Sequence, residues 1–485
     1  MKVLLLNPPM CYGAYNQAGR VYLDKSYPPL GLAYIAAALN QEGYNVKVLD
    51  LIDLSFDDAK KLIEKEKPEI VGISCNLTDY RWGAYRLAQI VKQVNADTKV
   101  VMGGSHATHL YEQVLSNFSV DIIVRFEGEV TFLELIRAIE AKCDLRSVKG
   151  IAFKVGNKIV RNEDRQPIED LDILPFPFHS SIEFERYVHY SAPASFKGKT
   201  VGKLKSINIM ASRGCPHNCM YCSIAQFWPR KCRLRSPKNV VDEMQALYEK
   251  FGVNHFNFFD DLFTLNQQRV IEICKEILDR NLDVCWECVT RVDFISEELL
   301  GWMKKAGCVS ISYGVESGSD TVLRAINKRQ SRAQVARAFQ MTHAAGIKAY
   351  ILLMVGNLQE SDRTIDETIE LVRVIEPDKI RTTLTMVYPA TDLYEFCKQK
   401  RFITDEYWLS DKAAPIFTVE NNVSQLKNWE NKINFAYNLQ KKKILRIYET
   451  LLYRNLFKNL REMLKFLFPK ADPYLERIDH LLHST

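Results

Sequence analysis

The sequence predicts an α/β protein with an N-terminal doubly wound parallel sheet, a partial (β/α)6 barrel and a helical C-terminal region. Three observations predict this architecture. Short apolar runs alternate with helical patterns through residues 2–140, a second alternating series begins at Ser206, and strand patterns fade after Ala413. Strands that alternate with helices are typical of parallel sheets covered by helices. A chain of 485 residues has room for two or three domains, and we expect the segments 1–142, 143–204, 205–412 and 413–485.

The first segment is expected to contain strands and helices in strict alternation. Its strands are rich in Val, Ile and Leu, as expected when helices cover both faces of a sheet. The strands are predicted at 2–6, 46–49, 70–74, 100–103 and 122–125, and the helices at 30–42, 56–65, 83–95, 109–116 and 129–139.

Residues 143–204 break this rhythm and are expected to form an ordered linker between the domains. Gly156-Asn157 separates two short apolar runs, which predicts a hairpin. Residues 174–178 cannot form a helix, because two prolines alternate with apolar residues there.

The second alternating series predicts six β/α units, with the active site at the carboxyl ends of the strands. The strands are expected at 206–211, 255–259, 284–289, 309–314, 348–355 and 379–386, and helices at 237–250, 268–279, 297–306, 332–345 and 362–375.

The composition is that of an ordinary globular protein, with 47% hydrophobic and 26% charged residues. The N-terminus lacks the long apolar run of a secretory signal, and no stretch approaches the roughly 18 uncharged apolar residues of a membrane span. We therefore expect a cytoplasmic location. The 12 cysteines are then not expected to form a disulfide framework.

The net charge of +6 resides in residues 421–485, which hold 12 Lys and Arg and 6 Asp and Glu residues. Since the remainder of the chain has no net charge, we expect no nucleic-acid partner for it. Residues 431–467 are helical in pattern, basic and rich in apolar residues. Such a helix can lie peripherally on the inner face of an anionic membrane, or it can pack on the barrel with its basic face in solvent.

Three cysteines, Cys215, Cys219 and Cys222, follow the first strand of the second series within eight residues. Three thiolates can hold three irons of a four-iron cluster and leave the fourth iron open. A zinc site completed by His217 is the alternative. Zinc motifs usually contain two separated pairs of ligands, and Cys285 and Cys288 lie in a strand, where residues three apart face opposite sides.

This cysteine spacing, with Tyr221 before the last cysteine, resembles that of the radical S-adenosylmethionine (SAM) superfamily, and residues 206–400 are similar to it as a whole. The supporting motifs are Phe259-Asp260-Asp261, Arg291-Val292-Asp293, residues 313–318 and Tyr388-Pro389-Ala390-Thr391. The resemblance implies a 4Fe-4S cluster whose open iron chelates SAM, which is then cleaved to methionine and a 5′-deoxyadenosyl radical. Residues 356–360 depart from the usual Gly-Leu-Pro-Gly-Glu turn of the family.

The same resemblance assigns roles around SAM. Tyr221 is expected near the adenine, and Glu316 is expected to accept the ribose hydroxyls. Asp260 or Asp261 is expected to meet the ammonium group and Arg291 the carboxylate, and Ser317 also belongs to the predicted SAM-binding residues. Helix capping or a surface ion pair is the alternative for the two aspartates and Arg291.

The N-terminal segment resembles the cobalamin-binding domain found ahead of many radical SAM domains, over residues 2–140. A flavodoxin-like interaction domain is the alternative from the residues alone. The resemblance implies that the corrin lies over the strand ends and that the nucleotide tail inserts along the sheet. The Asp-x-His-x-x-Gly motif is absent, and His106 is expected to border the nucleotide tail instead of binding cobalt; residues 77–82 are expected beneath the corrin. The predicted cobalamin-binding residues are Ser74, Gly103, Gly104, Glu127, Gly128 and Glu129.

The family resemblance implies methylation of an unactivated carbon in a small-molecule or lipid-like substrate, with an external electron donor such as flavodoxin or ferredoxin. One alternative is a radical cyclisation or ring rearrangement, as in the anaerobic porphyrin cyclases. A methylthiotransferase is another, in which the first domain carries three cysteines for a second cluster. Here that domain has Cys11, Cys75 and Cys143, but Cys143 lies beyond the last strand, so a third cysteine at a suitable strand end is lacking. The remaining alternative is a cobalamin-binding sensor or carrier that catalyses no reaction.

Overall fold

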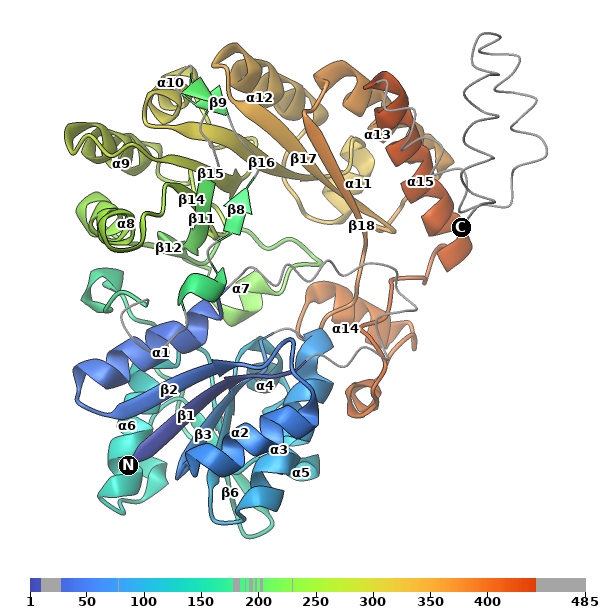
Figure 1. Cartoon of the computed structure of the whole chain (residues 1–485). Coiled ribbons are helices and arrows are strands. Elements are labelled where there is room, and N and C mark those ends of the chain that lie inside the picture. Colours follow the sequence, from blue (N-terminus) through green and yellow to red (C-terminus); the bar gives the residue numbers. More distant parts are fainter. Residues whose placement is uncertain are drawn as a thin grey trace, which may run out of the picture.

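The computed structural model describes residues 1–9, 28–76, 78–177, 184–187, 189–191, 195–196, 199–200, 204–228 and 230–441. Two α/β domains lie one above the other, with the N-terminal domain below and the barrel domain above (Figure 1). The predicted fold class is confirmed. None of the described helices is long and apolar enough to cross a membrane.

The N-terminal sheet has the order β2-β1-β3-β4-β5-β6-β7, and its first five strands run parallel. These strands are β1 (Lys2–Asn7), β2 (Asn45–Asp50), β3 (Ile70–Ser74), β4 (Lys99–Gly103) and β5 (Ile122–Val124). The helices are α1 (Leu30–Gln41), α2 (Phe56–Glu66), α3 (Arg81–Val94), α4 (Ser105–His109), α5 (Tyr111–Asn117) and α6 (Glu129–Glu140). The helix expected at 109–116 corresponds to α5, and a separate short helix, α4, precedes it across the non-helical Leu110.

Two cores cover the two faces of this sheet. Leu4 and Leu6 of β1 belong to a core with side chains of α2, α3 and α5. Val3 and Leu5 belong to a second core with side chains of α1 and α6. Alternate residues of one strand point to opposite faces, so a nearly continuous apolar strand is what a doubly wound sheet requires.

The hairpin expected in the linker belongs to the N-terminal sheet. Strands β6 (Ile151–Val155) and β7 (Lys158–Arg161) pair antiparallel, and β6 pairs antiparallel with β5. The hairpin pattern was visible in the sequence, but its partner strand lies about 30 residues earlier and pairing over that distance leaves no local signal.

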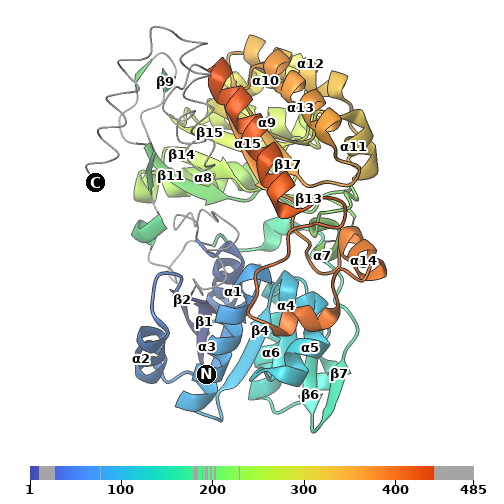
Figure 2. The same ribbon diagram turned by 90° about the vertical axis from the view of Figure 1, so that its right-hand side faces the viewer.

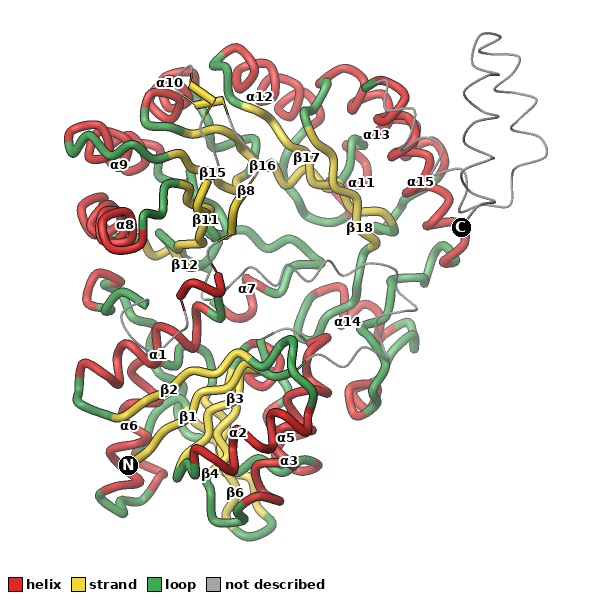
Figure 3. The backbone as a smooth tube through the Cα atoms, in the orientation of Figure 1, coloured by secondary structure: helices red, strands yellow, loops and turns green. Residues whose placement is uncertain are grey.

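The barrel sheet has the order β18-β17-β16-β15-β14-β11-β8, in which β8 is an antiparallel edge strand. Its six parallel strands match the six predicted units, and helices cover the outer face of the curved sheet (Figure 3). The main core lies between β11, β14–β17 and these helices. They are β11 (Leu204–Ile209), β14 (His255–Phe258), β15 (Cys285–Thr290), β16 (Cys308–Glu316), β17 (Lys348–Val355) and β18 (Lys379–Leu384). Short strands β8 (His189–Ser191), β9 (Ser195–Phe196), β10 (Lys199–Thr200), β12 (Ser212–Arg213) and β13 (Arg233–Leu234) complete the set.

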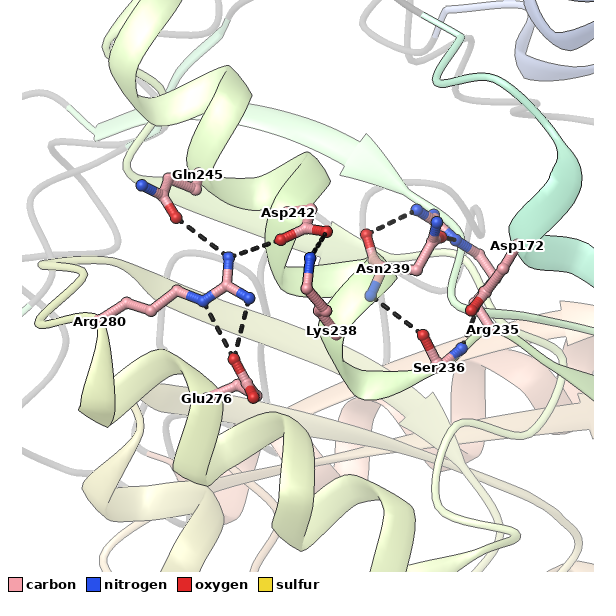
Figure 4. A network of polar contacts seen from close by, with 9 residues as sticks. All are labelled: Asp172, Arg235, Ser236, Lys238, Asn239, Asp242, Gln245, Glu276 and Arg280. Carbon is pink, nitrogen blue, oxygen red and sulfur yellow. Dashed lines mark hydrogen bonds and ion pairs between the residues drawn. The ribbon is translucent and has the colours of Figure 1, made fainter.

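The barrel helices are α7 (Ile224–Phe227), α8 (Pro237–Phe251), α9 (Gln267–Asp279), α10 (Glu297–Lys305), α11 (Asp320–Ala325), α12 (Arg332–Ala344), α13 (Asp362–Ile375) and α14 (Asp392–Gln399). A polar network braces α8 and α9, as Figure 4 shows. Arg280 donates to Asp242 and Gln245 of α8 and to Glu276 of α9. Asp172 of the linker accepts from the backbone of Ser236, the N-cap of α8, at 2.9 Å, so the linker is tied to the first barrel helix.

The C-terminal part of the described chain returns to both domains. Helix α15 (Val423–Gln440) packs along the barrel beside α13 and β18 (Figures 1 and 2). The helical C-terminal region is thereby confirmed up to Lys441. Most of the expected basic helix, together with Leu77, lies outside the described residues.

Candidate functional site

The three cysteines lie in the loop between β12 and α7, at the edge of the barrel that faces the N-terminal domain. Cys219 is buried, and Cys215 and Cys222 are half-buried. The loop is fixed by backbone hydrogen bonds, from the Met220 amide to the Ile326 carbonyl (3.0 Å) and from the Leu393 amide to the Met220 carbonyl (2.9 Å). Elements from two distant parts of the barrel therefore hold the middle of the loop.

Gly214 gives the loop its sharp entry. Its φ is +91°, and a Cβ there would lie 2.5 Å from the carbonyl oxygen of Lys231, so only glycine fits. The Gly214 amide donates to Asp261 Oδ2 at 3.1 Å. Asp260, by contrast, accepts from the Ala211 amide (3.1 Å) and the Ser212 hydroxyl. Both aspartates thus brace the strand-to-loop turn, and burial raises the pKa of Asp261 to about 6.

The cysteine side chains suit a cluster. Burial raises the pKa of Cys222 to about 12 and also raises the pKa of Cys215, so without metal the protonated thiols are favoured. Iron binds the thiolate and displaces that proton. Within the described part of the chain, no three Cys, His, Asp or Glu side chains are arranged around one metal ion.

Glu316 ends β16 in a left-handed conformation, with φ of +70°. Its Oε1 forms a buried ion pair with Lys328 Nζ at 2.8 Å, and the same ammonium group lies 3.3 Å from the hydroxyl of Tyr221. Strain of this kind concentrates at functional sites. The structure thus brings together Glu316 and Tyr221, both predicted to bind SAM, and adds Lys328, which was not predicted.

Arg291 and Ser317 are engaged inside the barrel domain. The Arg291 guanidinium forms a fork with both oxygens of Asp293 at 2.9 and 2.8 Å, and it donates to the Lys328 carbonyl at 2.8 Å. In this structure Asp293 therefore occupies the Arg291 guanidinium, which was expected to bind the SAM carboxylate. The bond to the Lys328 carbonyl holds Arg291 against the loop that carries Lys328. The Ser317 hydroxyl accepts from the Ser319 amide at 3.2 Å and lies 3.5 Å from Thr368 of α13.

Glu127 and Glu129 join the two domains. Glu127 Oε1 and Glu129 Oε1 accept from Arg213 Nη1 and Nη2 at 2.7 and 2.6 Å. Glu127 Oε2 accepts from Arg233 Nη1 at 2.7 Å. All four side chains are buried. We call these four residues the interdomain clamp. The two glutamates were expected beside the nucleotide tail. In the structure their carboxylates pair with two arginines of the two-stranded sheet β12–β13 in the barrel domain.

The remaining predicted cobalamin residues lie where the parallel strands end. Ser74 ends β3 and pairs in register with Gly103 of β4. Gly104 has φ of +104°, and a Cβ there would lie 2.7 Å from the backbone of Cys75 and Asn76. A Cβ on Gly128 would lie 2.5 Å from Ile35 of α1. Gly104 is therefore required for the close approach of the backbone, whereas a Cβ on Gly128 would displace only a side chain.

His106 is held within the domain by both ring nitrogens. Nε2 lies 2.8 Å from the Tyr85 hydroxyl, and Nδ1 lies 3.2 Å from Thr78 Oγ1. Burial lowers the pKa of His106 well below its usual value. The expected place of His106 beside the nucleotide tail stays a prediction.

Residues 78–82 dock onto a later part of the chain. The Arg81 guanidinium is buried and donates to the carbonyls of Trp408 (3.2 Å), Ser410 (2.7 Å) and Lys412 (2.5 Å). Asp79 accepts from the Ala414 amide at 2.9 Å and from the Tyr388 hydroxyl at 3.2 Å. Residues 78–82, expected beneath the corrin, thus contact residues 408–414 of the later chain.

Comparisons with known proteins match both halves. Residues 209–372 match the family model of the radical SAM superfamily, and residues 19–136 match that of the B12 binding domain. An uncharacterized methyltransferase of Pyrococcus horikoshii is 31% identical over 436 residues, which are 89% of each chain. The chain belongs to the cobalamin-binding radical SAM enzymes. Membership means a 4Fe-4S cluster, SAM and cobalamin as cofactors, and the cysteine loop described above fits the first of them.

Other relatives of this chain are named for different reactions. An anaerobic magnesium-protoporphyrin IX monomethyl ester cyclase of Rubrivivax gelatinosus is 35% identical over 405 residues, 81% of this chain and 70% of the relative. The solved methyltransferase TsrM of Kitasatospora setae has a TM-score of 0.69 and 18% identity, over 82% of this chain and 76% of that one. At this identity the likeness shows the shared fold.

Sequence reasoning missed the residues that work through distant partners. Arg213, Arg233 and Lys328 each contact a side chain far along the chain. Arg81 lies in the segment 77–82 that was expected beneath the corrin, but its contacts with residues 408–412 were not predicted. One signal could have found Arg213, because it directly precedes the Gly-Cys pair that begins the cluster loop.

Proposed function

We propose that this enzyme methylates an unactivated carbon of a small organic substrate. The observation that supports this most directly is the interdomain clamp. It ties Arg213, two residues before Cys215, to Glu127 and Glu129, which follow the last parallel strand of the N-terminal sheet. The carboxyl ends of both sheets, where parallel sheets bind ligands, are therefore held toward one another.

Each part of the chain has a task in this proposal. Cys215, Cys219 and Cys222 hold the cluster, and the Lys328–Glu316 pair and Tyr221 form one wall of the SAM site. When bound, the cluster would pass on the electron that cleaves SAM, and cobalamin would carry the methyl group. The clamp and residues 408–414 hold the domains together, which limits the access of water to reactive species. An external donor such as flavodoxin or ferredoxin is proposed as the source of the electron.

The atoms balance with two molecules of SAM. One gives its methyl group and leaves as S-adenosylhomocysteine. The other accepts one electron and is cleaved to methionine and a 5′-deoxyadenosyl radical. That radical takes a hydrogen atom from the substrate carbon and becomes 5′-deoxyadenosine. The substrate radical takes the methyl group of the first SAM, so the substrate gains one CH2 unit overall. Because that methyl group leaves SAM as a methyl cation equivalent, a second electron from the external donor completes the balance.

A radical cyclisation is the second candidate, because the Rubrivivax gelatinosus cyclase is 35% identical to this chain. A cyclisation also consumes SAM and forms 5′-deoxyadenosine, but it transfers no methyl group. The fate of the SAM methyl group therefore separates the two candidates.

The test is a labelling experiment on the full-length protein, reconstituted anaerobically with iron, sulfide and cobalamin. The holoenzyme is incubated with a reductant, metabolite extract and SAM whose methyl group carries three deuterons. We expect 5′-deoxyadenosine, S-adenosylhomocysteine and a product that retains deuterium. Deoxyadenosine with an unlabelled new product would replace methylation by cyclisation. If neither nucleoside forms while the cluster and cobalamin are bound, both candidates are wrong.

A further inference from the structure

A pocket opens between the domains on the side of β5. Its volume is about 430 Å3, within the usual range for small-molecule sites. The pocket is lined by the loop after β5, by residues 164–167 of the linker, and by residues 225–228 and Arg230 around α7. Helix α7 begins two residues after Cys222, so the pocket adjoins the end of the cluster loop.

The pocket contains a buried cation with incomplete pairing. The Arg125 side chain is 5% exposed, and its carboxylate partner, Asp164, is 39% exposed. Asp164 also accepts from Arg161 at 2.9 Å, so one carboxylate serves two arginines. Arg125 Nε is buried and has no hydrogen-bond partner among the described residues. A buried charge that lacks full pairing is costly, and a bound anion would relieve that cost.

Two further arginines line the same pocket, Arg165 and Arg230. Arg165 pairs with Glu134, and Arg230 is exposed. The only carboxylates in the lining are Asp164 and Glu127, and Glu127 is already neutralised by Arg213 and Arg233 in the clamp. The lining thus has an excess of positive charge.

The other wall is aromatic. Phe126 and Phe227, from different domains, have ring centroids 5.9 Å apart, and Phe227 meets Trp228 edge to face at 4.8 Å. All three line the pocket. Phe126 adopts φ of +60°, a conformation rare for a bulky residue, which directs its ring toward Phe227. Arginines beside an aromatic wall suit a flat or apolar body that bears an anionic group.

We propose that this pocket binds a carboxylate or phosphate group of the substrate, whose apolar body packs on Phe126, Phe227 and Trp228. The assignment to the substrate rests on the proposed methylation, whereas the anion site itself rests on the pocket. The same chemistry also exists in cobalamin, whose nucleotide tail contains a phosphodiester. The test must therefore separate these two sources of the anion.

The first part measures binding by calorimetry to the cobalamin-loaded holoenzyme, without turnover. The probes are phenylacetate and phenyl phosphate, with neutral phenylacetamide as the matched control. We expect the anions to bind and the amide to bind at least about tenfold more weakly, because a hydrogen bond to a charged group contributes about 1.5–3 kcal/mol. Added salt should weaken the binding of the anions. Equal binding of amide and anions, or no binding of any probe, overturns the proposal.

Variants locate the site. Arg125→Gln and Arg230→Gln should each weaken anion binding about tenfold, and Arg230 is exposed, so its replacement leaves the buried core untouched. The matched control is Arg363→Gln, since Arg363 is 88% exposed on α13 and its loss changes the net charge equally. A loss of binding as large in the control variant as in the pocket variants would contradict a local site.

The second part compares cobalamin with cobinamide, which lacks the nucleotide and its phosphate. If the substrate supplies the anion, the two pocket variants bind both corrinoids as the wild type does. If the variants lose affinity for cobalamin alone, the anion belongs to the nucleotide tail and the substrate assignment is wrong. If the probes bind but no methyl label is transferred, the proposed function is contradicted, whereas the anion site in the pocket is supported.

Discussion

Arg213 Nη1 and Glu127 Oε1 lie 2.7 Å apart in a buried ion pair that joins the barrel to the N-terminal domain. Arg213 is the last residue of β12 and is followed by Gly214 and Cys215. Its guanidinium also lies over the rings of Tyr34 (5.1 Å) and Trp228 (5.7 Å). The entry to the cluster loop is therefore fixed on the cobalamin-binding domain, not on the barrel alone.

The loss of one carboxylate should weaken the interdomain clamp. Glu127→Gln leaves Arg213 and Arg233 with a single full negative charge, that of Glu129, and an uncompensated buried charge costs about 3–5 kcal/mol. We expect the amide protons of residues 127–129 and 212–214 to exchange faster with deuterium. Glu163→Gln is the control, because Glu163 is 70% exposed and pairs with Lys149. Unchanged exchange in Glu127→Gln would show that the clamp does not hold the domains together.

Serine replacement of Cys215, Cys219 or Cys222 should abolish both the iron–sulfur absorbance and the formation of 5′-deoxyadenosine, since a hydroxyl is a poor ligand for this cluster. Cys143→Ser should leave both unchanged, because Cys143 is exposed beyond α6. The measurement is the iron content and visible spectrum after anaerobic reconstitution, followed by chromatography of the nucleosides. A full cluster in any of the three variants would refute the assignment of its ligand.

Arg81→Ala should release residues 408–414 from the N-terminal domain. The carbonyls of Trp408, Ser410 and Lys412 lose a charged donor, and such bonds contribute about 1.5–3 kcal/mol each. Limited proteolysis should then cut the variant within this segment sooner than the wild type. Arg86→Ala is a matched control on the same helix, because Arg86 stacks on Phe56 at 4.3 Å and not on this segment. Equal rates of cleavage in both variants would contradict the role of Arg81.

Glu360 should make stability depend on pH. Its Oε2 accepts from the amides of Gly356 (2.5 Å) and Asn357 (3.1 Å), and burial raises the pKa of Glu360 from 4.5 to about 7. The folded protein retains this proton where the unfolded chain has lost it. The stabilisation is therefore full below pH 4.5 and is lost as pH rises through about 7.

The measurement is the midpoint of thermal unfolding between about pH 5 and about pH 8, compared with that of Glu360→Gln. The wild type should lose up to about 3 kcal/mol relative to the variant over this range. Glu298→Gln, on the exposed side of α10, should follow the wild type. Parallel curves for the wild type and Glu360→Gln would show that Glu360 titrates normally.

The sequence determined the alternation of strands and helices, the parallel direction of the alternating strands and the position of the cysteine triad. Apolar periodicity is a local property, and the spacing of three cysteines is fixed by the chain itself. For that reason β3, β17 and α13 begin and end where the pattern predicted. The family likewise followed from motifs that are contiguous along the chain.

Only the tertiary structure decided which charged groups contact each other. Glu127 and Arg291 were expected at cofactors, yet Glu127 meets Arg213 and Arg291 meets Asp293. A charged side chain at a strand end can bind a ligand or an oppositely charged residue, and the local pattern is the same in both cases. The choice depends on which group lies within about 3 Å after folding, and that group comes from a segment of the chain that no local pattern connects to it.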